Sequence, residues 1–321
     1  MLRGRGPVAG ARIGACAGRR QTLGAEKPGH AGSDRAFRTR RQGYADADKS
    51  HRPRPVCRQP TQRGAGQVKP HARISAALRD ANAAGKTGLV PYITAGYPDK
   101  DLFIDTLRKI AAVADCVEVG VPFSDPMADG VTIQRASQQA IASGVSLRWI
   151  LQQLEAAGDL GVPIILMSYL NPLLVFGYEQ LADACLHSGV CGFIVPDLPL
   201  EEGDDFRAAL DGCDLALIQL VTPATPPERM KILCAASKGF VYAVTIRGIT
   251  GGAKALPAEV PAYLDGVRAI AEIPVCAGFG IRSAEQVASL GRHADGVIVG
   301  SALVEQLEAG NDPTDFLTAL R

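Results

Sequence analysis

From residue 72 onward, short apolar runs alternate with segments whose apolar residues recur at helical spacing. Eight of the runs are predicted to be strands: Gly88–Thr94, Cys116–Gly120, Val162–Met167, Cys191–Val195, Leu215–Val221, Phe240–Val244, Pro274–Ala277 and Gly296–Val299. Helices are predicted at Ile74–Ala84, Asp101–Ala114, Gln134–Ala142, Leu147–Ala157, Glu179–His187, Glu201–Leu210, Pro227–Ala236, Val260–Ala271 and Ala284–Leu290, and more helices close the chain.

This alternation predicts an α/β fold with parallel strands and right-handed crossovers. Eight units in residues 71–321 fit a closed (β/α)8 TIM barrel better than an open doubly wound sheet. An open sheet normally carries one glycine-rich turn after its first strand. In this chain the glycine-rich turns follow the sixth, seventh and eighth predicted strands instead.

Residues 1–70 form a separate, basic segment, with 13 Arg and 3 Lys against 4 Asp or Glu. They show little apolar periodicity, so a disordered N-terminal extension is expected. It is interpreted as non-native sequence from an over-extended start of translation or as a transit peptide. A nucleic-acid-binding arm is a third reading, but Phe37 and Tyr44 are too few for a stacking platform.

No apolar run approaches the roughly 20 residues that a membrane span needs. A cytoplasmic protein is therefore expected, or a plastid one if the extension is a transit peptide. The eight cysteines form no C-x-x-C pair and do not cluster with histidines, so no metal site is expected.

Two carboxylates in the run VEVGVPFSDPMADG, residues 117–130, are the candidate catalytic groups. The strand period of two places Glu118 on the same face as Cys116 and Gly120. A carboxylate inside an apolar strand is costly unless it is paired or protonated. With Asp129 on the following loop, Glu118 is predicted to form an acid–base pair. The alternative for Glu118 is a structural ion pair inside the barrel.

Two other loop carboxylates have weaker claims to the site. Asp125 lies in Ser-Asp-Pro, a common turn opening, and is expected to be structural. Asp197, after the fourth predicted strand, either faces the pocket or caps its own loop.

Glycines after the last three predicted strands suggest a phosphate site: Gly251, Gly280 and Gly300, the last followed by Ser301. Glycine lets the backbone approach an anion, and a helix that begins at Ser301 directs N–H groups toward it. The alternative is that these glycines only form tight turns. In (β/α)8 barrels, phosphate often binds after strands seven and eight.

Four aromatic residues at strand ends could line a pocket for a flat apolar group: Tyr92, Tyr169, Tyr242 and Phe279. Each taken alone is equally compatible with core packing. Together with the phosphate site and the two carboxylates, they suggest a phosphorylated aromatic substrate.

The chain resembles the alpha subunit family of tryptophan synthase over residues 72–321. The matching runs are LVPYITAGYPD (89–99), VEVGVPFSDPMADG (117–130), GFIVPDLPLEE (192–202), GFVYAVTIRGITG (239–251), AGFGIRSAEQV (277–287) and DGVIVGSALV (295–304). The resemblance implies a carbon–carbon lyase that cleaves indole-3-glycerol phosphate to indole and glyceraldehyde 3-phosphate without a cofactor. Glu118 matches the family's acid–base glutamate, and Asp129 matches the aspartate that binds the indole N–H.

The resemblance also implies the rest of the site. Tyr92, Ile133, Tyr169 and Tyr242 match the substrate pocket, and Gly251, Gly280, Gly300 and Ser301 match the phosphate site. Thr250 matches a residue of a loop that closes over Asp129.

The implied partner is a PLP-containing beta subunit in an alpha2beta2 complex, with contacts near Pro126 and Asn171. Val131 departs from the family's usual proline, and Ile246, Arg247 and residues 252–254 depart from its usual closing loop. Two rival readings are a free-standing indole-glycerol phosphate lyase and a non-catalytic subunit that activates a partner.

Overall fold

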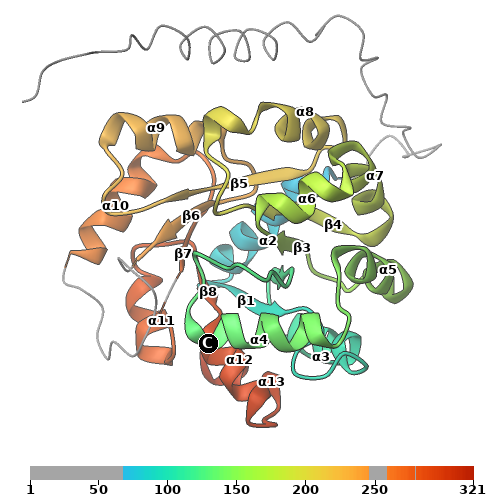
Figure 1. The fold of residues 1–321 in the computed structure, drawn as a ribbon. Coiled ribbons are helices and arrows are strands. Elements are labelled where there is room, and N and C mark those ends of the chain that lie inside the picture. The colour runs from blue at the N-terminus through green and yellow to red at the C-terminus, as the bar shows by residue number, and fades with distance from the viewer. Residues whose placement is uncertain (1–67, 246–258, 279) are drawn as a thin grey trace, which may run out of the picture. The chain divides into compact units, whose positions relative to one another are not determined.

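The computed structural model describes residues 68–245, 259–278 and 280–321. In this part of the chain eight parallel strands form a closed barrel in sequence order, as predicted (Figure 1). The strands are β1 (Gly88–Thr94), β2 (Val117–Gly120), β3 (Ile164–Met167), β4 (Val190–Ile194), β5 (Ala216–Val221), β6 (Val241–Val244), β7 (Val275–Gly278) and β8 (Gly296–Val299). β8 pairs with β1, and Val90 lies opposite Ile298 in that register.

Helices surround the barrel in the described residues (Figure 1). They are α2 (Pro70–Ala83), α3 (Phe103–Ala111), α4 (Val131–Ala142), α5 (Leu147–Ala157), α6 (Leu170–Phe176), α7 (Tyr178–Ser188), α8 (Asp204–Gly212), α9 (Pro227–Ala236), α10 (Val260–Ile270), α11 (Ala284–Leu290), α12 (Ser301–Glu308) and α13 (Pro313–Ala319). The predicted helix bounds differ from these by up to four residues. Residues 1–67 of the predicted extension lie outside the described residues.

Two helices differ from the sequence-based prediction. The seven-residue α6 was missed, because it contains Pro172 and is apolar at nearly all of its other positions, so it shows no helical alternation of polar and apolar residues. The helix predicted at Glu201–Leu210 is divided into a 3-10 turn, η1 (Leu200–Glu202), and α8, with Gly203 between them.

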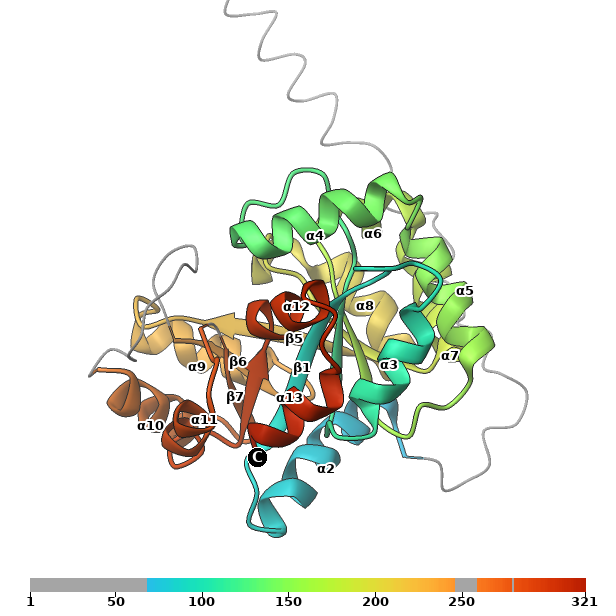
Figure 2. The same cartoon turned by 90° about the horizontal axis from the view of Figure 1, so that it is seen from below.

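Side chains alternate between the barrel interior and the layer beneath the helices. Val90, Cys116, Ile165 and Ile298 are among the residues of an inner cluster, whereas Val117 and Val119 pack in a separate outer cluster with the helices. Helix α2 joins the inner cluster through Ile74 and Leu78 and so covers one end of the barrel. A Cβ on Gly88, the first residue of β1, would lie 2.6 Å from Leu78 of α2, so α2 covers the amino end of this strand. In Figure 2, α2 lies at the bottom of the view and α4 at the top.

Two aspartates fasten the amino ends of the strands. Asp115 Oδ2 accepts hydrogen bonds from Leu89 N at 2.7 Å and from Arg321 Nη2 at 2.8 Å. Asp295 Oδ2 accepts from Val275 N at 2.8 Å, and Arg268 pairs with its other oxygen. These bonds fix the start of β1 against β2 and of β7 against β8.

Replacing Asp115 by Ala is expected to lower the free energy of unfolding by about 1–3 kcal/mol, because the Leu89 N–H and the Arg321 guanidinium lose their acceptor. Urea unfolding measures the effect. Asp105→Ala is the control, since the one ion pair of Asp105 among the described residues is with Arg108 on the exposed face of α3. An equal loss of unfolding free energy in the two variants would contradict the conclusion that the hydrogen bonds of Asp115 stabilise the start of β1.

Within the described residues, no helix is both long enough and apolar enough to cross a bilayer.

Candidate active site

Glu118 is a buried carboxylate inside the barrel. It stands on β2, opposite Tyr92 of β1 and Ile165 of β3, and is 1% exposed. Its Oε2 has no hydrogen-bond partner in the described part of the chain, and no ion pair found there includes it. The structural ion pair considered as an alternative is therefore absent from the described residues. Burial, with the nearby charge of Asp129, raises the Glu118 pKa to about 8.

Asp129 lies in the loop between β2 and α4, immediately before Gly130, the N-cap residue of that helix. Burial raises its pKa to about 6, while a hydrogen bond with the Tyr169 hydroxyl acts in the opposite direction. The charge of Asp129 also raises the pKa of Glu118, so the two carboxyl groups share one electrostatic environment. The arrangement keeps a protonated glutamate beside an aspartate that is largely ionised at pH 7.

Local contacts hold the loop that carries Asp129. Ala128 N donates to the Tyr169 hydroxyl at 2.8 Å, and the Tyr169 ring stacks on Phe123 with centroids 4.9 Å apart. Gln134 Nε2 donates to the Asp129 carbonyl at 2.9 Å. Tyr169 therefore ties the end of β3 to the loop that bears the second carboxylate.

Two glycines make room for tyrosine rings inside the barrel. A Cβ on Gly120 would lie 2.1 Å from the Tyr92 hydroxyl, and one on Gly278 would lie 2.5 Å from the Tyr242 hydroxyl. Any side chain at either position would displace the neighbouring ring. The Tyr92 hydroxyl shares a 3.2 Å hydrogen bond with Thr94 Oγ1.

Tyr92 and Ile133 pack together in one buried cluster with Met167 against it, and Tyr242 lies in the inner barrel cluster. The structure thus brings Tyr92 and Ile133 together. Sequence reasoning overlooked Met167, whose position at the carboxyl end of β3 was the available signal.

A candidate phosphate edge is formed by Gly280, Gly300 and Ser301. Gly280 has a φ of +80°, a conformation that favours glycine. Gly300 is the N-cap residue of α12, and Ser301 is the first residue of that helix, so the positive end of its dipole lies here. A Cβ on Gly300 would lie 3.6 Å from Tyr92, which places this edge beside the tyrosine that adjoins β2.

Several predicted positions lie outside the described residues. They are Thr250, Gly251 and Phe279 of the site, and Ile246, Arg247 and residues 252–254 of the closing loop. Val131, the other departure from the family pattern, is the first residue of α4 and is exposed.

The contacts of Asp197 and Asp125 clarify their roles. Asp197 Oδ1 accepts a hydrogen bond from Leu170 N at 2.9 Å, so it caps the start of α6. Asp125 is exposed and accepts a hydrogen bond from the adjacent Ser124 hydroxyl at 2.6 Å, in keeping with the expected turn role. Within the described part of the chain, no group of three His, Cys, Asp or Glu residues is placed to hold a metal.

These features define a (β/α)8-barrel protein with a carboxylate pair and a candidate anion-binding edge at the carboxyl ends of its strands. The family model for the tryptophan synthase alpha chain matches residues 78–320. The chain belongs to this family, which confirms the resemblance inferred from its sequence runs.

The chain matches individual relatives over almost the whole of their length. The chain is 46% identical over 250 residues to the tryptophan synthase alpha chain of Nitratidesulfovibrio vulgaris, covering 77% of this chain and 97% of the relative. A solved structure of Mycobacterium tuberculosis tryptophan synthase matches with a TM-score of 0.72 and 36% identity, covering 77% of this chain and 96% of that one. Tryptophan synthase subunit alpha from Legionella pneumophila matches with a TM-score of 0.70 and 34% identity, covering 79% and 97%.

Proposed function

We propose that this chain cleaves indole-3-glycerol phosphate to indole and glyceraldehyde 3-phosphate, as the alpha subunit of a tryptophan synthase. The observation that carries the proposal is the buried Glu118, whose Oε2 is unpartnered and whose pKa is raised to about 8 beside Asp129. A carboxylic acid that keeps its proton at neutral pH can deliver that proton to a carbon atom.

In the proposed reaction Glu118 protonates the indole ring carbon that bears the glycerol side chain. The resulting positive charge at the ring nitrogen is stabilised by ionised Asp129, which accepts the N–H hydrogen bond. The bond from that carbon to the side chain then breaks, and its electron pair returns to the ring to restore the indole. The adjacent side-chain hydroxyl becomes the aldehyde, and its proton returns to Glu118.

The substrate is proposed to span the carboxyl end of the barrel. Tyr92, Ile133, Tyr169 and Tyr242 would contact the indole and glycerol parts, and Gly280, Gly300 and Ser301 would hold the phosphate. The roles assigned to Thr250, Gly251 and Phe279 remain predictions. No cofactor is proposed for this chain, and PLP is assigned to the beta subunit.

The test is indole release from indole-3-glycerol phosphate by the full chain, with and without a beta subunit. Weak release that the beta subunit stimulates supports the proposal. High release that does not respond to the beta subunit identifies a free-standing lyase. Absence of cleavage by the folded chain in both conditions overturns the proposal and leaves a non-catalytic subunit.

The rate of cleavage is expected to have a bell-shaped pH dependence. Activity requires ionised Asp129, which is lost as pH falls through about 6, and protonated Glu118, which is lost as pH rises through about 8. The pH profile of kcat/KM in the assembled complex measures the two limbs, because this ratio reports the ionisation of the free enzyme. A rate that is flat from pH 5 to 9 would contradict these roles.

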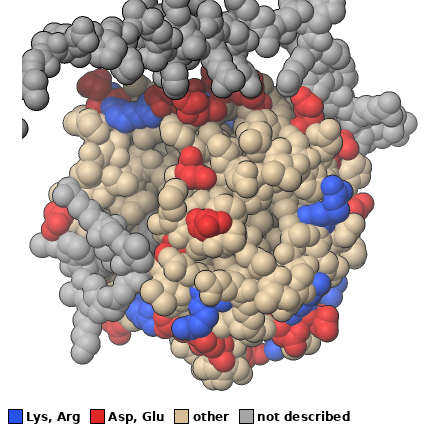
Figure 3. Space-filling view, viewed as in Figure 1, with Lys and Arg blue, Asp and Glu red and all other residues tan. Residues whose placement is uncertain are grey.

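Exposed apolar side chains support the proposed partner contact. Met127 (78% exposed) and Val131 (69%) lie on or just after the loop that bears Asp129, and Leu174 (58%) and Val175 (79%) lie on α6. The Ala128–Tyr169 hydrogen bond joins the two segments. In Figure 3 the surface over α6 is mostly uncharged, whereas Lys, Arg, Asp and Glu side chains lie in the lower part of the view near α4.

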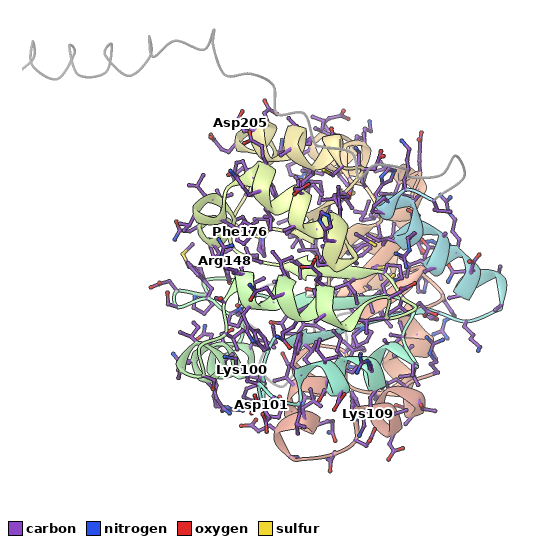
Figure 4. All side chains as sticks on the ribbon, turned by 90° about the vertical axis from the view of Figure 1, so that its right-hand side faces the viewer. Lys100, Asp101, Lys109, Arg148, Phe176 and Asp205 are labelled. Atoms are coloured by element: carbon purple, nitrogen blue, oxygen red, sulfur yellow. The ribbon has the colours of Figure 1, made fainter. Side chains whose placement is uncertain are left out.

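A cation–π contact anchors α6 from its other end. The Arg148 guanidinium of α5 lies 4.9 Å from the centroid of the Phe176 ring (Figure 4). Exposed Leu174 and Val175 are thus presented from a helix fixed at both ends, by the Asp197 cap and by Arg148. We propose that this surface docks on the beta subunit in an alpha2beta2 complex.

Replacing both Leu174 and Val175 by Glu is expected to reduce stimulation by the beta subunit at least about tenfold, because two charges would enter an apolar contact. Unstimulated indole release should change less than about twofold. Ile232→Glu, at another exposed apolar position on α9, is the control and should keep full stimulation. Full stimulation of the double variant would exclude this surface as the docking site.

A cytoplasmic location is also proposed. The bacterial relatives reported above give no support to plastid import.

A further inference from the structure

One carboxylate on α12 contacts two other segments of the barrel rim. Glu305 accepts a hydrogen bond from Thr132 Oγ1 at 3.2 Å through its Oε1. The Arg282 guanidinium donates to both Glu305 oxygens, at 3.4 Å to Oε1 and at closer range to Oε2. Glu305 Oε1 is therefore shared by donors from two segments that lie far apart in the sequence.

Each segment that meets at Glu305 carries part of the proposed site. Arg282 follows Gly280 by two residues, and Ser301 precedes Glu305 by one helical turn on α12. The turn that carries Arg282 and the first turn of α12 therefore adjoin the phosphate edge. Thr132 lies on α4 between Asp129 and the pocket residue Ile133 and leads to the indole end.

We propose that Glu305 is a positioning residue that couples the phosphate end of the site to the indole end. This inference rests on the proposed function. An anion bound between Gly280 and Ser301 orders the turn that carries Arg282 and the start of α12. Glu305 transmits this ordering to Thr132 and the Asp129 loop, so phosphate at one end strengthens binding of the indole ring at the other.

A second ion pair on the same helix gives a matched comparison. Glu308, one turn after Glu305, pairs with Arg135 of α4. It thus joins the same two helices, but none of its contacts among the described residues reaches the turn that follows Gly280. A general α4–α12 brace would depend on both glutamates, whereas the proposed coupling depends on Glu305 alone.

Thr132→Val is the decisive substitution because it removes only the hydroxyl and leaves all charges around the phosphate edge unchanged. Thr132→Ser keeps the hydroxyl and is the conservative rescue. Substituting Glu305 or Arg282 would change the local charge, and phosphate affinity would then shift for a reason unrelated to coupling.

The experiment titrates indole into the full chain with and without saturating inorganic phosphate, for the wild type, Thr132→Val, Thr132→Ser and Glu308→Gln. Phosphate is expected to strengthen indole binding roughly fivefold in the wild type. The ratio of the indole dissociation constants without and with phosphate should fall to nearly one in Thr132→Val. Thr132→Ser and Glu308→Gln should keep the wild-type ratio.

A wild-type ratio in Thr132→Val, or a ratio of one in the wild type, would overturn the inference while leaving the proposed function intact. Equal loss in Glu308→Gln and Thr132→Val would identify a general brace and also overturn it. A wild-type chain that binds neither indole nor phosphate would remove the proposed function together with the coupling.

Discussion

Indole release by the Glu118→Gln variant, measured in the presence of a beta subunit, is expected to fall about 10³-fold. The amide keeps the size of the side chain but has no proton to transfer to the indole carbon and no base to accept the hydroxyl proton. Substrate affinity should change little, so the loss is expected in kcat rather than in KM.

At high pH the Glu118→Gln variant is expected to be more stable than the wild type. Burial raises the folded-state pKa of Glu118 to about 8 from an ordinary value of 4.5, so the folded chain resists ionisation that the unfolded chain undergoes freely. The wild type therefore loses stability as pH rises from about 4.5 to 8, and glutamine removes this penalty. Urea unfolding should show a difference on the order of a few kcal/mol at pH 8.5 that vanishes near pH 4.

The two measurements on Glu118→Gln test different statements. Lost activity with increased stability at pH 8.5 is the expected combination for a buried catalytic acid. Lost activity with decreased stability would point to a structural carboxylate instead. Retained activity would remove Glu118 from the mechanism.

Indole release by Asp129→Asn is expected to fall on the order of 10²-fold. Asparagine can still accept the indole N–H hydrogen bond, but it lacks the charge that stabilises the protonated ring. The acidic limb of the pH profile should disappear. The basic limb should move to lower pH, because the charge of Asp129 contributes to the raised pKa of Glu118.

Asp125→Asn is the control for this substitution, since Asp125 lies on the same loop but is exposed and contacts Ser124. Its rate should remain within about threefold of the wild type. Similar losses in the two variants would indicate that loop structure, rather than the charge of Asp129, accounts for the effect. An unchanged basic limb in Asp129→Asn would contradict the electrostatic link between the two carboxyl groups.

Several features were predictable because they depend on local periodicity. The eight apolar runs specify parallel strands, and their number specifies closure of the barrel. The period of two along β2 places Glu118 inside the barrel, and the observed burial agrees with it. The family motifs then assign chemistry to positions that the strand pattern brings to one end.

Other features depend on residues that are distant in the sequence. The role of Asp197 as a cap was undecided until its contact with Leu170, on the missed helix α6, became visible. Met167 resembled an ordinary strand residue until it was found against the cluster of Tyr92 and Ile133.

By itself, the sequence determined the barrel, the inward direction of Glu118 and the family. Periodicity reflects backbone geometry directly, and the family motifs are contiguous runs that can be read without the fold. Only the tertiary structure decided how these parts meet. The raised pKa values arise from burial by the assembled barrel, and Thr132 reaches Glu305 across 173 residues of sequence. Such contacts leave no periodic signal, since they depend on the relative placement of separate elements rather than on the spacing within one.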